Sequence, residues 1–250
     1  MLKVENLGNS TENEVQAKKL WQKADAVCFD VDSTLCVDEM IDEFAKYLHC
    51  YEVIKFTEEA MNGKISFRES LKIRLNILKP TRKQLKEFIR EREPKLTPGS
   101  EALVTELHRR FVPVYLVSGG FVSMILPVAK ALKIPETNIH ANEIFFDENG
   151  FYIGFDETRE TSDSGSENFG KAAVCRKLKD GKGYRNLVMI GDGVTDLETS
   201  AQADLFIGFG GNRCREVVKR KASWYFTTHI HKVHIYHISI NSVLATDLQK

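Results

Sequence analysis

Short apolar runs alternate with longer helical stretches along this chain. Four of the runs have the length and apolar composition of buried strands, and they cover residues 26–29, 112–117, 187–190 and 205–209. Each run is followed at once by glycine, serine or acidic residues. Strands that alternate with helices are typical of βαβ units. We therefore expect an α/β fold with a doubly wound, mostly parallel, Rossmann-like sheet.

One interval, residues 41–98, has helical periodicity and no strand-like run. Two of its segments begin with capping-box patterns, which favour the start of a helix. These patterns are Ser66-x-x-Glu69 and Thr81-x-x-Gln84. We therefore expect a helical domain over residues 41–98, inserted after the first strand. The α/β core would then be discontinuous, with residues 1–40 and 99–250.

A β-hairpin is predicted over residues 144–155. Two apolar runs flank Asn149 and Gly150 there, and this dipeptide favours a tight hairpin turn. The hairpin is expected to decorate the main sheet.

The composition excludes several classes of protein. Apolar residues make up 42% of the chain and aromatic residues 10%, well above the content of disordered sequences. Thirty-five basic residues balance 35 acidic ones, so no net charge attracts nucleic acid or an anionic membrane. No stretch reaches the ~18–20 apolar residues of a membrane span, and the five cysteines form no CxxC pair. These features predict a soluble, cytoplasmic protein without nucleic-acid or membrane partners.

Two pairs of aspartates follow two of the predicted strands. Asp30 and Asp32 are spaced so that both carboxylates project to one side while the backbone stays extended. Asp192 and Asp196 follow the third strand, and the carboxyl ends of parallel strands open onto a common crevice. Four acids there would repel one another unless a cation lies among them, and Mg²⁺ prefers such oxygen ligands. Asp-x-Asp is also common in turns and at helix N-termini, so the first pair alone is not decisive.

Two further segments suit a phosphate. Ser118, Gly119 and Gly120 follow the second strand and offer a hydroxyl and two unhindered amides at the start of the next predicted helix. Lys171 opens another helical stretch, from which its ammonium would reach both a phosphate and Asp30. A lysine by itself is more often a solvated surface group, so its significance depends on the other segments.

Taken in order, these segments resemble the motifs of the haloacid dehalogenase superfamily. Further segments are similar to the branch of that superfamily that hydrolyses phosphoserine, and the resemblance covers roughly residues 18–226. The additional matching segments are Ala60-Met61, Phe67 and residues 24–34, 96–99, 155–158 and 206–211. The resemblance implies a Rossmann-like core with a helical cap domain after the first strand, and hydrolysis of O-phospho-L-serine, the last step of serine biosynthesis.

The resemblance also implies a chemical role for each acid. Asp30 is expected to attack phosphorus and form an aspartyl phosphate, while Asp32 acts first as an acid and then as a base. Asp30, Asp192 and the backbone carbonyl of Asp32 are the expected Mg²⁺ ligands, and Asp196 is expected just outside them. Lys171 is the expected catalytic lysine.

Substrate-binding residues follow from the same resemblance. Ser118, Gly119, Gly120 and Thr195 are expected around the phosphoryl group. Glu39 is assigned to the substrate ammonium and Arg74 to its carboxylate, which suits the fork geometry of arginine. Met61 and Phe67 are expected to cover the bound amino acid. Without the resemblance, solvated helix charges would explain Glu39 and Arg74 better, and core packing would explain Met61 and Phe67 better.

Three features depart from the family's pattern. Asn62 stands where close relatives usually have glycine, and residues 164–170 include extra residues directly before Lys171. The C-terminal tail contains His229 and His231, which would share one face of a strand and favour Zn²⁺ or Ni²⁺ if they form a site.

Alternative functions remain open at this point. The chain is expected to bind a small molecule, and one alternative is a related phosphatase for another small phosphomonoester. A second is a binding protein that has lost its activity, which the extra residues and the tail favour. A dehalogenase or a fragment of a P-type pump fits poorly. The sequence does not decide between a monomer and a homodimer.

Overall fold

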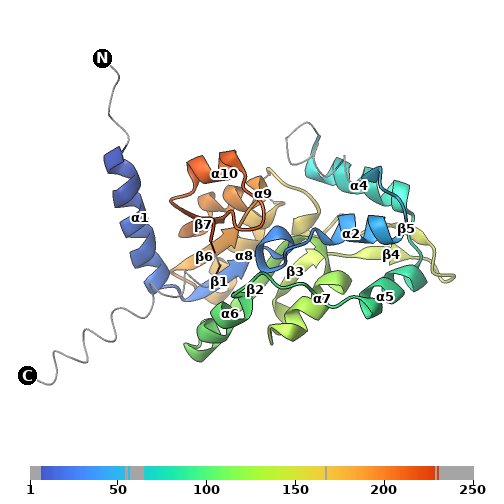
Figure 1. Cartoon of the computed structure of the whole chain (residues 1–250), viewed down its shortest axis with the longest axis horizontal. Coiled ribbons are helices and arrows are strands. Elements are labelled where there is room, and N and C mark those ends of the chain that lie inside the picture. The colour runs from blue at the N-terminus through green and yellow to red at the C-terminus, as the bar shows by residue number, and fades with distance from the viewer. Residues whose placement is uncertain (1–6, 54–55, 57–64, 167, 229, 231–250) are drawn as a thin grey trace, which may run out of the picture.

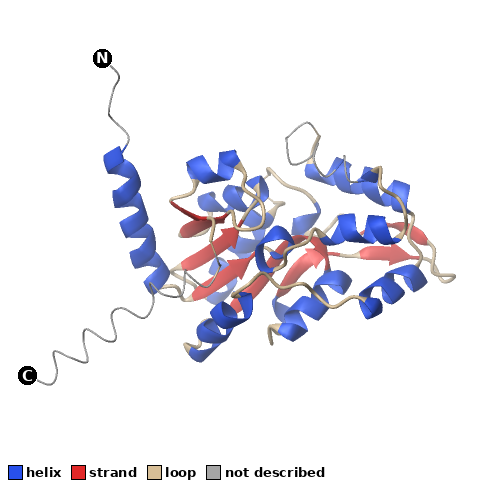
Figure 2. Cartoon of the chain, in the orientation of Figure 1, coloured by secondary structure: helices blue, strands red, loops and turns tan. Residues whose placement is uncertain are grey.

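The computed structural model describes residues 7–53, 56, 65–166, 168–228 and 230. Within them, a parallel sheet has the strand order β3-β2-β1-β6-β7-β8 and helices on both faces (Figures 1 and 2). Its strands are β1 (Ala26–Phe29), β2 (Val114–Phe121), β3 (Ile139–Asn142), β6 (Leu187–Gly191), β7 (Leu205–Phe209) and β8 (Trp224–Phe226). The predicted fold class is confirmed, and all four predicted strands are present.

The helices have the following bounds: α1 (Leu7–Gln22), α2 (Met40–Tyr47), α4 (Phe67–Leu78), α5 (Arg82–Glu91), α6 (Ser100–Arg109), α7 (Val122–Ala131), α8 (Lys171–Lys182), α9 (Val194–Leu197) and α10 (Glu216–Lys221). In the described part of the chain, no helix has the length and apolar character to cross a membrane.

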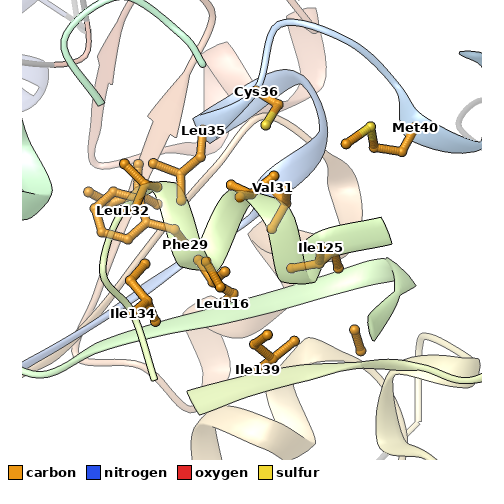
Figure 3. Close-up of a cluster of buried hydrophobic side chains, with 14 of the residues drawn as sticks. Phe29, Val31, Leu35, Cys36, Met40, Leu116, Ile125, Leu132, Ile134 and Ile139 are labelled. Carbon is orange, nitrogen blue, oxygen red and sulfur yellow. The ribbon is translucent and has the colours of Figure 1, made fainter. Parts of the chain in front are cut away.

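Alternate residues of the central strand enter two different hydrophobic clusters. Phe29 of β1 packs with Leu116 of β2 and Ile125 of α7 on one face (Figure 3). Cys28 of β1 packs on the other face with Cys175 of α8. Because both faces of β1 are buried, its position is fixed on both sides, and the residues that follow it are held firmly.

The sequence misplaced the end of the second strand. The predicted run stops at residue 117, whereas β2 continues to Phe121, which pairs with Asn142 of β3 after a register shift. Helix α7 begins only after this pairing, at Val122. Ser118 and the two glycines therefore lie within the last residues of strand β2 and not at the start of a helix. The pairing of β2 with β3 continues past them to Phe121.

The first strand is also followed by something other than extended backbone. Residues Val31–Leu35 form a wide turn, η1, which Asp30 caps by accepting a hydrogen bond from the Val31 amide at 2.7 Å. Asp32 keeps extended backbone angles within this turn. The backbone therefore does not stay extended from Asp30 through Asp32 as predicted, although both residues still line one cavity.

Helices α2, α4 and α5 belong to the interval for which a separate domain is predicted, and no strand occurs among its described residues. Thr81 forms a complete capping box with Gln84 at the start of α5. At the start of α4, the Ser66 hydroxyl accepts a hydrogen bond from the Glu69 amide. The segments before and after this interval lie side by side, because Cys36 and Leu96 form an isolated antiparallel bridge. The domain boundary at residues 41–98 itself stays a prediction.

The predicted hairpin is confirmed as a separate two-stranded sheet of β4 (Ile144–Phe146) and β5 (Tyr152–Phe155). It lies next to α5 at the end of the molecule far from α1 (Figure 1). Arg82 of α5 donates hydrogen bonds to the carbonyls of Phe146 and Asp147. The hairpin therefore supports the helices of residues 41–98 rather than the main sheet.

Candidate active site

A cavity lies at the carboxyl ends of β1, β2 and β6, between the sheet and helices α2 and α4. Most of the predicted site residues line it, from segments that are far apart in the sequence. The predicted residues in its wall are Asp30, Asp32, Glu39, Phe67, Arg74, Ser118, Gly119, Gly120, Lys171, Asp192 and Thr195. Met61, Asn62, His229 and His231 lie outside the described residues.

Lys171 forms two short ion pairs inside the protein. Its Nζ atom lies 2.7 Å from Oδ1 of Asp30 and 2.6 Å from Oδ1 of Asp196. Burial opposes the charged form of this lysine, but Asp196 and Asp30 outweigh that effect and raise its pKa above the ordinary value. The ammonium therefore stays charged, and the extra residues before α8 have not displaced it from the cavity.

Three buried carboxylates gather beside this lysine. Asp30, Asp192 and Asp196 each offer an oxygen within 4.8 Å of the others. Burial and the charge of Asp30 raise the pKa of Asp192 to about 7, and the same two causes raise the pKa of Asp196. A hard divalent cation would remove this repulsion, and carboxylate oxygens are the ligands it prefers. The donor set thus fits a metal ion, although the Asp32 carboxylate is not among the three.

Asp32 occupies a separate place in the wall of the cavity. Its Oδ1 accepts a hydrogen bond from the backbone amide of Met40 at 3.0 Å. Burial, followed by the charges of Glu39 and Asp30, raises the pKa of Asp32 well above its ordinary value. A carboxyl group with a raised pKa suits general acid catalysis.

The Ser-Gly-Gly segment is shaped by close contacts. Ser118 Oγ accepts a hydrogen bond from the Gly120 amide at 3.0 Å. The ring of Phe67 lies against Gly119, where an added Cβ would come within 2.5 Å of the ring carbon Cζ. Only glycine permits this approach. Phe67, on α4, therefore covers the segment predicted to bind phosphate.

Asn142 is a residue that the sequence analysis missed. It is completely buried at the end of β3 and donates from Nδ2 to the carbonyls of Gly119, at 2.9 Å, and Thr161, at 3.1 Å. Its Oδ1 accepts from the Thr161 hydroxyl at 2.9 Å. This amide therefore fixes the backbone of the Ser-Gly-Gly segment from behind.

The two residues predicted to recognise an amino acid line the same cavity. Glu39 accepts a hydrogen bond from the Ser33 hydroxyl at 2.9 Å. Arg74 is 4% exposed, and its Nε donates to the Ser70 carbonyl at 3.3 Å. Burial lowers the pKa of Arg74, while Asp42 and Glu39 act in the opposite direction. An acid and a buried arginine in one small cavity suit the two charges of an amino acid.

Arg215 is a second residue that the sequence analysis missed. Its Nε lies 3.1 Å from Oδ2 of Asp192, and its terminal nitrogen lies 3.7 Å from Oε1 of Glu39. It therefore connects the carboxylate cluster to Glu39. The sequence offers no local signal for this role, because the residue stands in a basic loop before α10.

Comparisons with known proteins agree with this geometry. A haloacid dehalogenase-like hydrolase model matches residues 24–204. The chain is 46% identical to phosphoserine phosphatase of Homo sapiens over 213 residues, which cover 85% of this chain and 93% of that protein. A solved phospho-aspartyl intermediate analogue of phosphoserine phosphatase has a TM-score of 0.71 and 28% identity, over 85% of this chain and 98% of that chain.

A longer protein also contains a similar unit. The structure of DsGPDH of Dunaliella salina has a TM-score of 0.76 and 32% identity, over 88% of this chain but only 37% of that chain. The family model and the human relative each cover most of the present chain. The chain therefore belongs to the haloacid dehalogenase-like hydrolases and, within them, to the phosphoserine phosphatase family.

Proposed function

We propose that the protein hydrolyses O-phospho-L-serine to L-serine and inorganic phosphate in an Mg²⁺-dependent reaction. One observation carries the proposal: the buried Asp30 carboxylate lies beside Lys171, within a carboxylate cluster, in the same cavity as Glu39 and Arg74. The carboxylate cluster with Lys171 suits phosphoryl transfer. The pair of Glu39 and Arg74 suits a zwitterionic amino acid. Relatives that bear the name phosphoserine phosphatase support the same substrate.

In the first step, a carboxylate oxygen of Asp30 attacks phosphorus, and the bond between phosphorus and the serine oxygen breaks. Asp32 gives its proton to the departing serine oxygen, which its raised pKa favours. Lys171 and the amides of the Ser118–Gly120 segment balance the negative charge on the phosphoryl oxygens. The products of this step are L-serine and an aspartyl phosphate. The relative solved as a phospho-aspartyl intermediate analogue supports this route.

In the second step, Asp32 takes a proton from water, and the water oxygen attacks phosphorus. The bond between phosphorus and Asp30 breaks, which releases phosphate and restores the carboxylate. Thr195, in the wall of the cavity, is proposed to contact the phosphoryl group. One carboxyl group thus acts first as acid and then as base, so no proton is lost or gained over the cycle.

Mg²⁺ is the proposed ion, held by the carboxylates of Asp30 and Asp192 and by the backbone carbonyl of Asp32. When bound, it would supply positive charge beside the phosphoryl oxygens and so reduce their repulsion with Asp30. Asp196, which accepts hydrogen bonds from Lys171 and from the Gly193 amide at 2.8 Å, is proposed to orient the lysine.

Recognition of the amino acid is proposed to come from the helices of residues 41–98, which we propose as the cap domain, and from Glu39, directly before them. Glu39 would bind the ammonium group and Arg74 the carboxylate. Phe67 already covers Gly119, so it would enclose the substrate side chain, together with Met61. A sugar phosphate or a nucleotide has no use for this pair of charges, which favours phosphoserine over other phosphomonoesters.

The test measures phosphate release from L-phosphoserine by the purified protein, with Mg²⁺ and with EDTA. The Asp30→Asn variant is measured in the same way, and a simple aryl phosphate serves as a second substrate. We expect Mg²⁺-dependent release from phosphoserine that the Asp30→Asn variant lacks, with its thermal unfolding close to that of the wild type. No release from either substrate by folded, Mg²⁺-loaded protein would overturn the proposal.

A further inference from the structure

Arg68, the second residue of α4, contacts the core at several points. Its guanidinium nitrogen donates to the Glu157 carbonyl at 3.2 Å and to the Ser162 hydroxyl at 2.9 Å. Its Nε lies 3.4 Å from Oδ2 of Asp163. Its Cζ lies 4.5 Å from the centre of the Phe169 ring. We call this set of contacts the Arg68 latch.

The loop that receives the latch leads directly into Lys171. It includes the segment 164–170, in which the sequence has extra residues and to which Phe169 belongs. The Gly165 amide donates to Glu198 at 3.1 Å, and the Gly170 amide donates to the Glu160 carbonyl at 2.6 Å. Gly170 has a φ of +93°, a conformation that favours glycine and turns the chain into α8. Because the loop is held at both ends, it presents a defined surface to α4.

Helix α4 carries two of the groups proposed to bind substrate. Phe67, next to Arg68 in the sequence, covers Gly119, and Arg74 reaches the cavity two turns further along. A further ion pair between this helix and the core joins Lys72 to Glu157. Its atoms are 3.9 Å apart and its side chains are 62% and 50% exposed, so it contributes little. The Arg68 and Asp163 side chains are each only 26% exposed.

We propose that Arg68 is a positioning residue that holds α4 over the phosphate-binding segment by means of the Arg68 latch. The proposal rests on the proposed function and deepens it: the loop before Lys171 helps to select an amino-acid phosphoester, because it fixes the helix that carries Phe67 and Arg74. Arginine suits the role since one planar group donates to a carbonyl and a hydroxyl while it stacks on a ring.

The test compares Arg68→Ala, Arg68→Lys, Phe169→Ala and the double variant Arg68→Ala/Phe169→Ala in the full chain. Lys72→Ala is the matched control, because it removes a positive charge from the same face of α4 one turn away. Hydrogen–deuterium exchange of the α4 amides is measured without any ligand. Steady-state kinetics are measured with phosphoserine and with an aryl phosphate, and thermal unfolding reports the global stability.

We expect Arg68→Ala to raise KM for phosphoserine about tenfold, as the loss of charge-assisted contacts typically does, with kcat within about twofold of wild type. The KM for the aryl phosphate should change less, because that substrate does not use Arg74. The α4 amides should exchange faster, and Arg68→Lys should restore part of the effect. The double variant should be no worse than Arg68→Ala, since residues that act together are not additive.

Two results would overturn the latch: unchanged exchange of the α4 amides in Arg68→Ala, or an equal increase in Lys72→Ala. A fall in kcat for both substrates, with a lower midpoint of thermal unfolding, would also contradict it and indicate a general structural role. The exchange measurement decides the latch independently of catalysis. If the wild type releases no phosphate from phosphoserine, the proposed function fails while the comparison of exchange rates still stands.

Discussion

The Nζ atom of Lys171 lies 2.7 Å from Oδ1 of Asp30, although one residue begins a helix and the other follows the central strand. The lysine is 5% exposed and also contacts Asp196. A buried charge is tolerated only when it is paired. The charge of this lysine therefore stabilises the buried carboxylates of Asp30 and Asp196 in the folded protein.

The first prediction concerns Lys171→Met, which keeps the length of the side chain but removes its charge. Breaking a buried ion pair typically destabilises a protein by about 3–5 kcal/mol, so the free energy of unfolding should fall by that order. Added Mg²⁺ should restore part of the loss, because a cation again balances the carboxylates. Denaturant unfolding with and without Mg²⁺ measures this. Lys182→Met, at the exposed end of the same helix, is the control and should change little.

The second prediction concerns pH. Asp192 has a pKa raised to about 7 by burial and by Asp30, against about 4 for an unfolded aspartate. The metal-free folded state thus binds more protons than the unfolded state in this range. Its stability should fall as the pH rises from about 4 to about 7 and level off above that. Thermal unfolding of the metal-free protein across this range measures the effect.

The same carboxylates must lose their protons to bind a cation. The increase in the unfolding midpoint caused by Mg²⁺ should therefore grow as the pH rises through 7, and it should shrink in Asp192→Asn. A stabilisation by Mg²⁺ that is the same at pH 5 and pH 8 would contradict this account of the cluster.

The third prediction concerns Arg74→Met, which preserves most of the buried aliphatic side chain. A hydrogen-bonded charge contributes about 1.5–3 kcal/mol, so kcat/KM for phosphoserine should fall roughly a hundredfold. The value for an aryl phosphate should change far less, since it has no carboxylate to bind. Arg90→Met, on the exposed face of α5, serves as the control. An equal loss with both substrates would argue against a carboxylate clamp.

The sequence predicted most of the site because its chemistry is local. The acids and the Ser-Gly-Gly segment each directly follow a strongly apolar run at the carboxyl end of a parallel strand, so their convergence follows from the sheet. What it missed depends on contacts between distant segments. β3 has the mixed sequence Ile-His-Ala-Asn and gives no strand signal, so the role of Asn142 was hidden. Arg215 and Arg68 contact residues that are far from them in the sequence, and no local sequence pattern predicts such contacts.

The last prediction concerns Asn142, which holds the Gly119 carbonyl from behind. Asn142→Ala leaves that carbonyl and the Thr161 hydroxyl without their buried partner, which should cost about 1–3 kcal/mol of stability. The loss should also lower kcat, because the amides of the Ser118–Gly120 segment are no longer held in place for the phosphoryl group.

Asn138→Ala is the matched control for this variant. Asn138 precedes the other end of β3 and donates a similar hydrogen bond, at 2.9 Å, to the Val114 carbonyl, far from the cavity. The Asn138→Ala variant should have a lower free energy of unfolding without a lower kcat. Unfolding and steady-state kinetics of the two variants therefore separate general support of β3 from support of the segment Ser118–Gly120, which we propose to bind phosphate. A similar kcat in both variants would mean that Asn142 only stabilises the sheet.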